Sequence, residues 1–185
     1  MQNIIVSDVF GKTSALITLA HEINASVIVD PYDGLNMNFK DEIQAYTYFT
    51  EHIGIDKYVA ILLNRIKEYS GDCRLIGFSI GASVIWALSQ LASTKNAKVA
   101  RESICYYGSQ IRNMSKLSPK FEVTLIFPQS ESHFDVLALQ QTLVNLEKVT
   151  TIHVDFLHGF MNTHSKNFHH LGYTEHLVFL REIST

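Results

Sequence analysis

The segment best suited to do chemistry is the pentapeptide Gly77–Gly81, which reads Gly-Phe-Ser-Ile-Gly. It follows the predicted strand segment Arg74-Leu75-Ile76, and it precedes an apolar stretch that is typical of a buried helix. In this context the sharp turn lifts a serine hydroxyl above the sheet, and glycines on either side avoid collisions with backbone. Ser79 is therefore the candidate nucleophile. A phosphate-binding turn is the alternative, but no Lys followed by Ser or Thr comes after the second glycine.

A serine nucleophile needs a base, and the candidate is His158, which comes just after the last predicted strand. Where this type of elbow occurs, the chain order is Ser, then an acid, then His. His153 lies within the predicted strand, so we expect it to pack or to face solvent. The other late histidines, His164, His169 and His170, fall in loops, and no carboxylate or cysteine joins them at the spacing of a metal site.

Two acids compete for the place between nucleophile and base. Glu131 falls four residues beyond the predicted strand 122–127, where its carboxylate could hold His158 in one tautomer. Asp135 opens a predicted helix and has an alternative role as its N-cap. We favour Glu131 as the orienting acid.

The oxyanion of an acyl intermediate would be held by backbone N–H groups. Ser79 stands at a predicted helix start, so the N–H of Ile80 is one donor, and the loop after the first strand supplies a second from Val9. Asp8 in that loop either points toward the nucleophile or caps an ordinary turn, and the sequence leaves both open.

The elements that must position these residues alternate along the chain. Short apolar runs predict strands, and apolar residues at helical spacing predict helices. The predicted strands are 3–9, 26–29, 73–78, 102–107, 122–127 and 150–156. The predicted helices begin near Thr13, span Asp41 to Ser70 as two helices broken near Gly54, and cover 82–91, 136–146 and 173–183.

This alternation predicts an α/β fold: a three-layer α/β/α sandwich around a doubly wound, mostly parallel sheet of about six strands. One domain fills residues 1–185, and the short crossover at 111–120 leaves no room for a cap domain. Ligands in such sheets bind beyond the carboxyl ends of the strands, where the candidate residues all fall.

Composition restricts the partners. The net charge of −3 gives no basic footprint for nucleic acid. No apolar run approaches the length of a membrane span, and the start of the chain lacks the pattern of a secretory signal. Cys73 and Cys105 fit neither a metal spacing nor a disulfide framework. We therefore expect a cytoplasmic protein with reduced core thiols and no cofactor.

Taken together, the segments resemble the dienelactone hydrolase family of the α/β-hydrolase superfamily, and the match runs in order along most of the chain. The family has an oxyanion-loop motif, an Asp-Leu-Tyr-like segment, a Gly-x-Cys-x-Gly or Gly-x-Ser-x-Gly elbow, a Tyr-Tyr-Gly segment, an acid turn and a His-Gly-Phe motif. The corresponding segments here are Asp8–Gly11, Asp30–Tyr32, Gly77–Gly81, Tyr106–Gly108, Pro128–His133 and His158–Phe160.

The resemblance implies cleavage of a small carboxylic ester or lactone through an acyl-enzyme. Three departures qualify it: the chain opens on the oxyanion strand where the family has further antiparallel strands, Ser79 replaces the cysteine of dienelactone hydrolases proper, and the acid is Glu131 rather than Asp. The substrate therefore need not be the lactone for which the family is named. The strand edge left without those antiparallel strands also makes a homodimer conceivable.

Five residues are candidates for substrate contact. Arg112 follows the fourth strand and could bind a carboxylate, although a solvated arginine is the plainer interpretation. Tyr32 and Phe160 could line an acyl pocket or simply pack, and Asp8 and Phe10 flank the oxyanion donor. The competing functions are a thioesterase or small-peptide hydrolase using the same residues, and a non-catalytic binding protein that kept the fold.

Overall fold

The computed structural model describes residues 1–69, 72–91 and 99–184. Over these residues it contains one six-stranded sheet in the order β2-β1-β3-β4-β5-β6, and every neighbouring pair of strands is parallel. The strands are β1 Gln2–Val6, β2 Ala25–Val29, β3 Cys73–Phe78, β4 Glu102–Tyr106, β5 Glu122–Phe127 and β6 Val149–His153. The predicted α/β sandwich with about six strands and no cap domain is confirmed.

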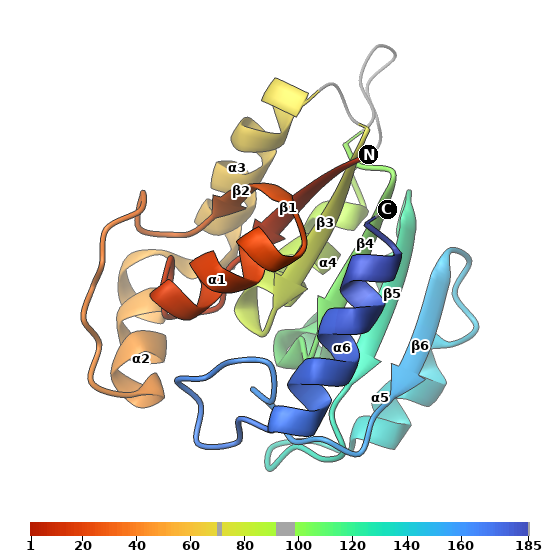
Figure 1. Cartoon of the computed structure of the whole chain (residues 1–185). Coiled ribbons are helices and arrows are strands. Elements are labelled where there is room, and N and C mark those ends of the chain that lie inside the picture. Colours follow the sequence, from red (N-terminus) through yellow and green to blue (C-terminus); the bar gives the residue numbers. More distant parts are fainter. Residues whose placement is uncertain (70–71, 92–98, 185) are drawn as a thin grey trace.

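Helices cover both faces of the sheet (Figure 1). One face packs against α1 and α6, and the other packs against α3, α4 and α5, while α2 lies beside α3. Their bounds are α1 Ser14–Glu22, α2 Glu42–His52, α3 Gly54–Ile66, α4 Ile80–Ser89, α5 Val136–Leu143 and α6 His170–Glu182, with short 3-10 helices η1 Lys67–Tyr69 and η2 Ser109–Met114.

The central strands β1, β3, β4 and β5 are buried on both sides because helices cover both faces of the sheet there, whereas the edge strands β2 and β6 are more exposed. In β1, Ile4 and Val6 join the core under α3 and α4, whereas Ile5 joins the core under α1 and α6. Leu75 and Ile76 alternate in the same way in β3. This two-sided burial explains why the central strands appear in the sequence as continuous apolar runs.

The strand order reverses at one place, between β1 and β3. From β1 the chain moves outward to β2, then returns across the sheet to β3 and proceeds to β6. At such a switch point the two connecting loops diverge and leave a crevice at the carboxyl ends of the strands. Ser7 and Asp8 follow β1 and Ser79 follows β3, so the candidate site lies at this crevice.

Several element boundaries differ from the sequence prediction. The first strand ends at Val6 rather than Val9, because Asp8 and Gly11 close a turn with a 3.2 Å backbone hydrogen bond. The last strand ends at His153 rather than Phe156. The predicted helix that follows Gly54 was expected to end at Ser70, and Ser70 lies outside the described residues.

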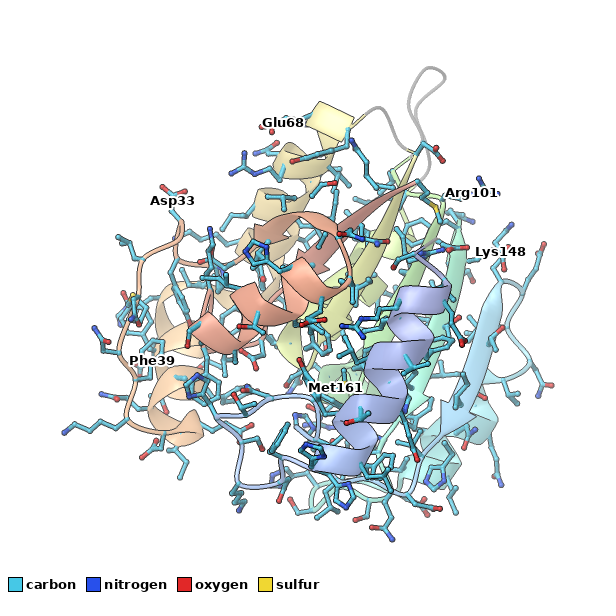
Figure 2. The ribbon with its side chains drawn as sticks, in the orientation of Figure 1. Asp33, Phe39, Glu68, Arg101, Lys148 and Met161 are labelled. Carbon is cyan, nitrogen blue, oxygen red and sulfur yellow. The ribbon has the colours of Figure 1, made fainter. Side chains whose placement is uncertain are left out.

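At the amino end of the sheet, the chain termini are held together. Arg74 on β3 is buried, and its guanidinium forms an ion pair with Glu102, contacts Asn3 Oδ1 at 3.3 Å and donates to the carbonyl of Ile183. Figure 2 shows Glu68, Arg101 and Lys148 at this same end, away from the carboxyl ends of the strands.

Cys73 and Cys105 are free, buried thiols, as predicted, and burial raises the pKa of each, to about 11 and about 12. Among the described helices, none combines the length and the apolar character needed to cross a bilayer.

Candidate active site

Ser79 occupies a strained turn between β3 and α4. Its backbone has φ 51° and ψ −111°, a conformation that residues with a side chain rarely adopt. The neighbouring strand holds the turn, since the Ser79 N–H donates to the carbonyl of Tyr106 at 2.9 Å. Strain that is overdetermined by its surroundings is typical of functional sites.

The two glycines of the elbow are required by close packing. A Cβ on Gly77 would lie 2.6 Å from Ile85 Cδ1 and 2.8 Å from the Ala82 backbone nitrogen. A Cβ on Gly81 would collide with the carbonyl oxygens of Val6 and Ser7 at the end of β1. The elbow therefore fits against β1 only with these glycines, and this contact places Ser79 beside the loop that follows β1.

The structure brings together the three residues that were predicted to act as a unit. His158 Nε2 lies 3.0 Å from Ser79 Oγ, and His158 Nδ1 lies 2.6 Å from Glu131 Oε1. The side chains of His158 and Glu131 are 19% and 10% exposed, so their contact is partly shielded from water. This is the nucleophile–base–acid arrangement in which a carboxylate orients an imidazole toward a hydroxyl.

The loop that carries His158 is fixed from several sides. Asn167 Nδ2 donates to the carbonyl of His158 at 2.9 Å, and the ring of Tyr107 lies 4.8 Å from the imidazole. Gly159 has φ 86°, and a Cβ there would collide with Ser165. These contacts restrict the loop and the imidazole that it carries.

The two candidate acids lie in different surroundings in the structure. Asp135 is the N-cap of α5, where its carboxylate accepts from the N–H of Ala138 at 3.0 Å. Glu131 reaches His158 instead. In the geometry, Asp135 thus has the capping role and Glu131 has the contact with the imidazole.

Two tyrosines form hydrogen bonds to the loop after β1. Tyr32 Oη donates to the carbonyl of Val9 at 2.8 Å. Tyr58 Oη, from α3, lies within 3.1 Å of Ser7 Oγ and of the carbonyl oxygens of Ser7 and Val29. Val9 is 3% exposed, so the loop carrying the predicted oxyanion donor has little freedom to move.

The Asp8 carboxylate has the capping role that the sequence offered as one alternative, and its hydrogen bonds go to Phe10 and Asn162. Its carboxylate accepts from the N–H of Phe10 at 2.9 Å and so caps the turn, and it also lies beside Ser79 and His158 in one hollow. Burial raises the pKa of Asp8 to about 6, against the opposing hydrogen bonds from Phe10 and Asn162.

Two hollows meet at Ser79 and His158. The small hollow holds about 10 Å³ and is lined by Asp8, Val9, Phe10, Ser79, Tyr107, His158 and neighbouring residues. The wide groove holds about 830 Å³ and runs between α2, η2, the loop 130–133 and the loop carrying His158. Ser79 and His158 therefore line both the small hollow and the wide groove.

Comparison with known proteins places the chain in a family. No protein-family model matches it. The protein YczH of Bacillus subtilis (strain 168), itself uncharacterized, is 32% identical over 175 residues, which cover 83% of this chain and 84% of YczH. The chain belongs to the YczH family.

Solved structures identify the fold of this YczH-family chain as that of the α/β hydrolases. It is similar to P91, a dienelactone hydrolase-like promiscuous phosphotriesterase from metagenomic libraries, with a TM-score of 0.64 and 10% identity over 98% of this chain and 86% of P91. It is also similar to Est1E from Butyrivibrio proteoclasticus, with a TM-score of 0.61, 10% identity and the same coverage.

The remaining candidate residues of the YczH-family chain fall into two groups. Phe10 lines the small hollow and Arg112 lines the wide groove. Tyr32 and Phe160 line neither of the two hollows that contain Ser79. Tyr32 supports the Val9 loop, and Phe160 is fully buried among aromatic rings, so both have a packing role.

The sequence analysis did not identify several residues that line the wide groove but lie far from Ser79 along the chain. Glu42 and Tyr46 reach it from α2, and Lys166 reaches it from the loop after His158. It also missed Asn162, which hydrogen-bonds Asp8. No local pattern marks these positions, because their role depends on loops that meet only in the folded chain. Among the described residues, no group of three or more His, Cys, Asp or Glu could hold a metal ion.

Proposed function

We propose that this YczH-family protein is a serine hydrolase that cleaves small carboxylic esters or lactones through an acyl-enzyme on Ser79. The observation that carries the proposal is the continuous contact from Glu131 through His158 to Ser79, at 2.6 Å and 3.0 Å. The likeness in fold to P91, which is described as dienelactone hydrolase-like, supports the proposal.

In the proposed reaction, Ser79 Oγ attacks the carbonyl carbon while His158 Nε2 takes the hydroxyl proton. Glu131 holds the imidazole in the tautomer that exposes Nε2 to the serine and stabilises the imidazolium that forms. The N–H groups of Val9 and Ile80 stabilise the oxyanion. His158 then donates the proton to the leaving oxygen, and water, activated by the same imidazole, releases the acid.

Two features support the oxyanion assignment. Ile80 is the first residue of α4, and the N–H groups of a helix's first turn have no partner within the helix. Val9 lines the small hollow together with Ser79 and His158, on a loop that Tyr32 holds in place.

A fluorophosphonate probe followed by intact mass and peptide mapping tests the activated serine. We expect one adduct, on Ser79, that is lost in Ser79→Ala and His158→Ala and in the unfolded protein. Ser132→Ala, which removes another hydroxyl of the wide groove, is the matched control and should label normally. An unlabelled wild-type protein across neutral pH would refute the proposal and favour a binding protein that kept the fold.

Turnover on p-nitrophenyl, thioester and amide substrates then tests the bond that is cleaved. We expect the oxygen ester to be the best substrate and Ser79→Ala to lose at least about three orders of magnitude in kcat. A thioester or amide preference with the same Ser79 adduct would keep the serine mechanism and replace the ester assignment.

A further inference from the structure

A third hollow lies beside the small hollow, at the first turn of α1, and we call it the α1 hollow. It shares Asp8, Tyr107 and Asn162 with the small hollow, whereas Ser79 and His158 do not line it. Its volume of about 20 Å³ has room for about one water molecule. The residues that line it are Asp8, Thr13, Ala15, Leu16, Leu19, Phe78, Tyr107, Met161 and Asn162.

The Tyr107 hydroxyl is a buried polar group at this hollow. Tyr107 is 2% exposed, and its Oη forms no hydrogen bond to any residue that the structure describes. Burial raises the pKa of Tyr107 well above its usual value, the Asp8 carboxylate raises it further, and the nearby Met161 backbone lowers it without reaching hydrogen-bond geometry. Met161, which is labelled in Figure 2, lines the α1 hollow but not the small hollow. The hydroxyl therefore faces the α1 hollow.

The ring of Tyr107 is held in this position by its backbone and by its packing. The backbone has φ 41°, which is strained for a residue with a bulky side chain, and the Tyr107 N–H donates to the carbonyl of Ile126 at 2.8 Å. The ring centre lies 5.6 Å from that of Phe160 and 4.8 Å from that of His158. Because an unpaired buried hydroxyl is costly, a ligand that accepts its proton would stabilise the folded protein.

Other walls of the α1 hollow offer further hydrogen-bonding groups. The Asp8 carboxylate accepts from the Phe10 N–H and from Asn162, and a carboxylate has about four acceptor sites, so it can accept from one more donor. The Thr13 hydroxyl accepts from the Leu16 N–H at 3.2 Å and keeps its own proton to donate. A ligand in this hollow therefore has the two or more polar partners that a buried water needs.

The charges around the α1 hollow favour a neutral ligand. The Asp8 carboxylate on one wall disfavours an anion. Thr13, the N-cap of α1, and Ala15 form another wall, and the positive end of the helix dipole there disfavours a cation. The ligand must accept a proton from Tyr107 and donate one to Asp8, so it is both a donor and an acceptor. A water molecule combines these properties with the size of the hollow.

We propose that the α1 hollow is a binding site for one water molecule, which accepts a hydrogen bond from Tyr107 Oη and donates one to the Asp8 carboxylate. Tyr107 directly follows β4 and Asp8 follows β1, so the water links the ends of two strands that are separated in the sheet by β3. The proposal does not depend on the serine hydrolase function, because neither Ser79 nor His158 lines this hollow.

The stability of Tyr107→Phe tests the proposal by its sign. If a water bridges the hydroxyl, the variant loses a hydrogen bond, and its equilibrium constant for unfolding should rise by about two- to tenfold. If the hydroxyl has no partner, the same change removes a buried unpaired group and should stabilise the protein. Urea unfolding measures the difference, and a Tyr107→Phe variant that is as stable as the wild type, or more stable, would overturn the proposal.

Tyr106→Phe is the matched control, because Tyr106 is also fully buried but its Oη lies 3.2 Å from His176 Nδ1. It should lose stability in the same range as Tyr107→Phe, since each change removes one hydroxyl with a partner. Asp8→Asn combined with Tyr107→Phe should cost less than the sum of the two single changes, because both groups bind the same water. Strictly additive costs would contradict a shared ligand.

A crystal structure of the wild type identifies the ligand directly. We expect one peak of solvent density within about 3 Å of Tyr107 Oη and of an Asp8 oxygen, and none at this place in Tyr107→Phe. A crystal soaked in rubidium bromide should show no anomalous peak in the α1 hollow. A hollow without density, or an anomalous peak from either ion, would overturn the water assignment.

These results are independent of the test of the proposed function. Unfolding and crystallography require no turnover, and labelling of Ser79 by the fluorophosphonate probe does not report on the α1 hollow. A protein with a labelled Ser79 and a stabilised Tyr107→Phe variant would retain the serine hydrolase and lose the water site. An unlabelled protein with ordered water between Tyr107 and Asp8 would give the reverse.

Discussion

The amide of Asn162 donates a 2.7 Å hydrogen bond to the carboxylate of Asp8, and so joins two loops whose residues are 154 positions apart. One loop carries Val9 and the other carries His158. Because Asn162 is uncharged, it offsets only part of the cost of burying the carboxylate, and the pKa of Asp8 is raised to about 6. The contact between the loops is thus maintained by a group that titrates near neutral pH.

Asp8→Asn should change the dependence of stability on pH. The raised pKa means that the folded protein binds this proton more tightly than the unfolded chain, whose ordinary value is 3.8. The free energy of unfolding of the wild type should therefore fall as the pH rises from about 4 to about 6, and Asp8→Asn should lack this fall. Urea unfolding at several pH values measures it.

The control for this titration is Asp33→Asn, which changes an exposed carboxylate away from the site (Figure 2). It should follow the wild-type pH profile. Wild-type and Asp8→Asn curves that run parallel from pH 4 to 7 would contradict a raised pKa at Asp8. Two other titratable groups also influence the pKa of Asp8: Glu42 raises it and His158 lowers it.

Glu131→Gln should lower kcat by about a thousandfold or more, because an amide in that place can hold the imidazole in the wrong tautomer and does not stabilise the imidazolium. KM should change little, since the Glu131 side chain is only 10% exposed and is engaged by His158. Steady-state kinetics on an acetate ester measures both constants.

Asp135→Asn is the matched control, because it removes the rival carboxylate while an asparagine still caps α5. It should keep kcat within about twofold, since its carboxylate bonds the Ala138 N–H rather than the imidazole. The reverse result, with Asp135→Asn inactive and Glu131→Gln active, would exchange the two roles.

Gly81→Ala should damage both the elbow and the activity. The new Cβ meets the carbonyl oxygens of Val6 and Ser7, so β1 or α4 must shift by some tenths of an ångström. We expect a loss of about 1–3 kcal/mol in the free energy of unfolding and a large fall in kcat, as Ser79 moves away from Val9.

Gly34→Ala is the control for Gly81→Ala, because the added Cβ at Gly34 would strain the backbone without colliding with other atoms. Gly34 has φ 77° and open space around its Cβ position, so alanine there costs about 1–2 kcal/mol for its conformation alone. Its kcat should stay at the wild-type level, as measured on the same acetate ester. A Gly81→Ala variant with normal kcat would show that the elbow tolerates displacement.

The fold could be predicted from the sequence, and so could the three residues that the fold brings into contact, because each has a local signal. Ser79 sits in a turn that needs glycines on both sides, and Glu131 and His158 each follow a predicted strand in the order Ser, acid, His. The sequence marks the ends of strands less clearly. Residues 7–9 were included in the first predicted strand because Val9 is apolar, but the strand ends at Val6 and Val9 is buried within the following loop.

The remainder of the site depends on contacts that no local pattern encodes. Asn162 acquires a role only when its loop meets Asp8, and Lys166 and Glu42 reach the groove from opposite ends of the chain. The sequence left Tyr32 with two roles, lining an acyl pocket or packing, and only the folded chain shows that its hydroxyl donates to the carbonyl of Val9. The substrate-facing residues are therefore the least predictable from sequence, because they are placed by loops and not by the periodic core.

Arg74→Met should destabilise the protein without changing the site. The guanidinium of Arg74 is 7% exposed and pairs with Glu102, which is 35% exposed, while it also holds Asn3 and the carbonyl of Ile183 near the chain ends. Removing one partner of a buried pair costs about 3–5 kcal/mol, and the partial exposure of Glu102 places the expected loss at or below the lower end, about 2–3 kcal/mol.

Urea unfolding compares this variant with Arg65→Met, whose pair with Glu68 lies on the surface of the protein with side chains 46% and 58% exposed. That change should cost less than about 1 kcal/mol. Esterase kcat of folded Arg74→Met should equal that of the wild type, because Arg74 lies at the amino end of β3 and Ser79 follows its carboxyl end. Equal unfolding midpoints for the two variants would show that the buried pair contributes no more than a surface pair.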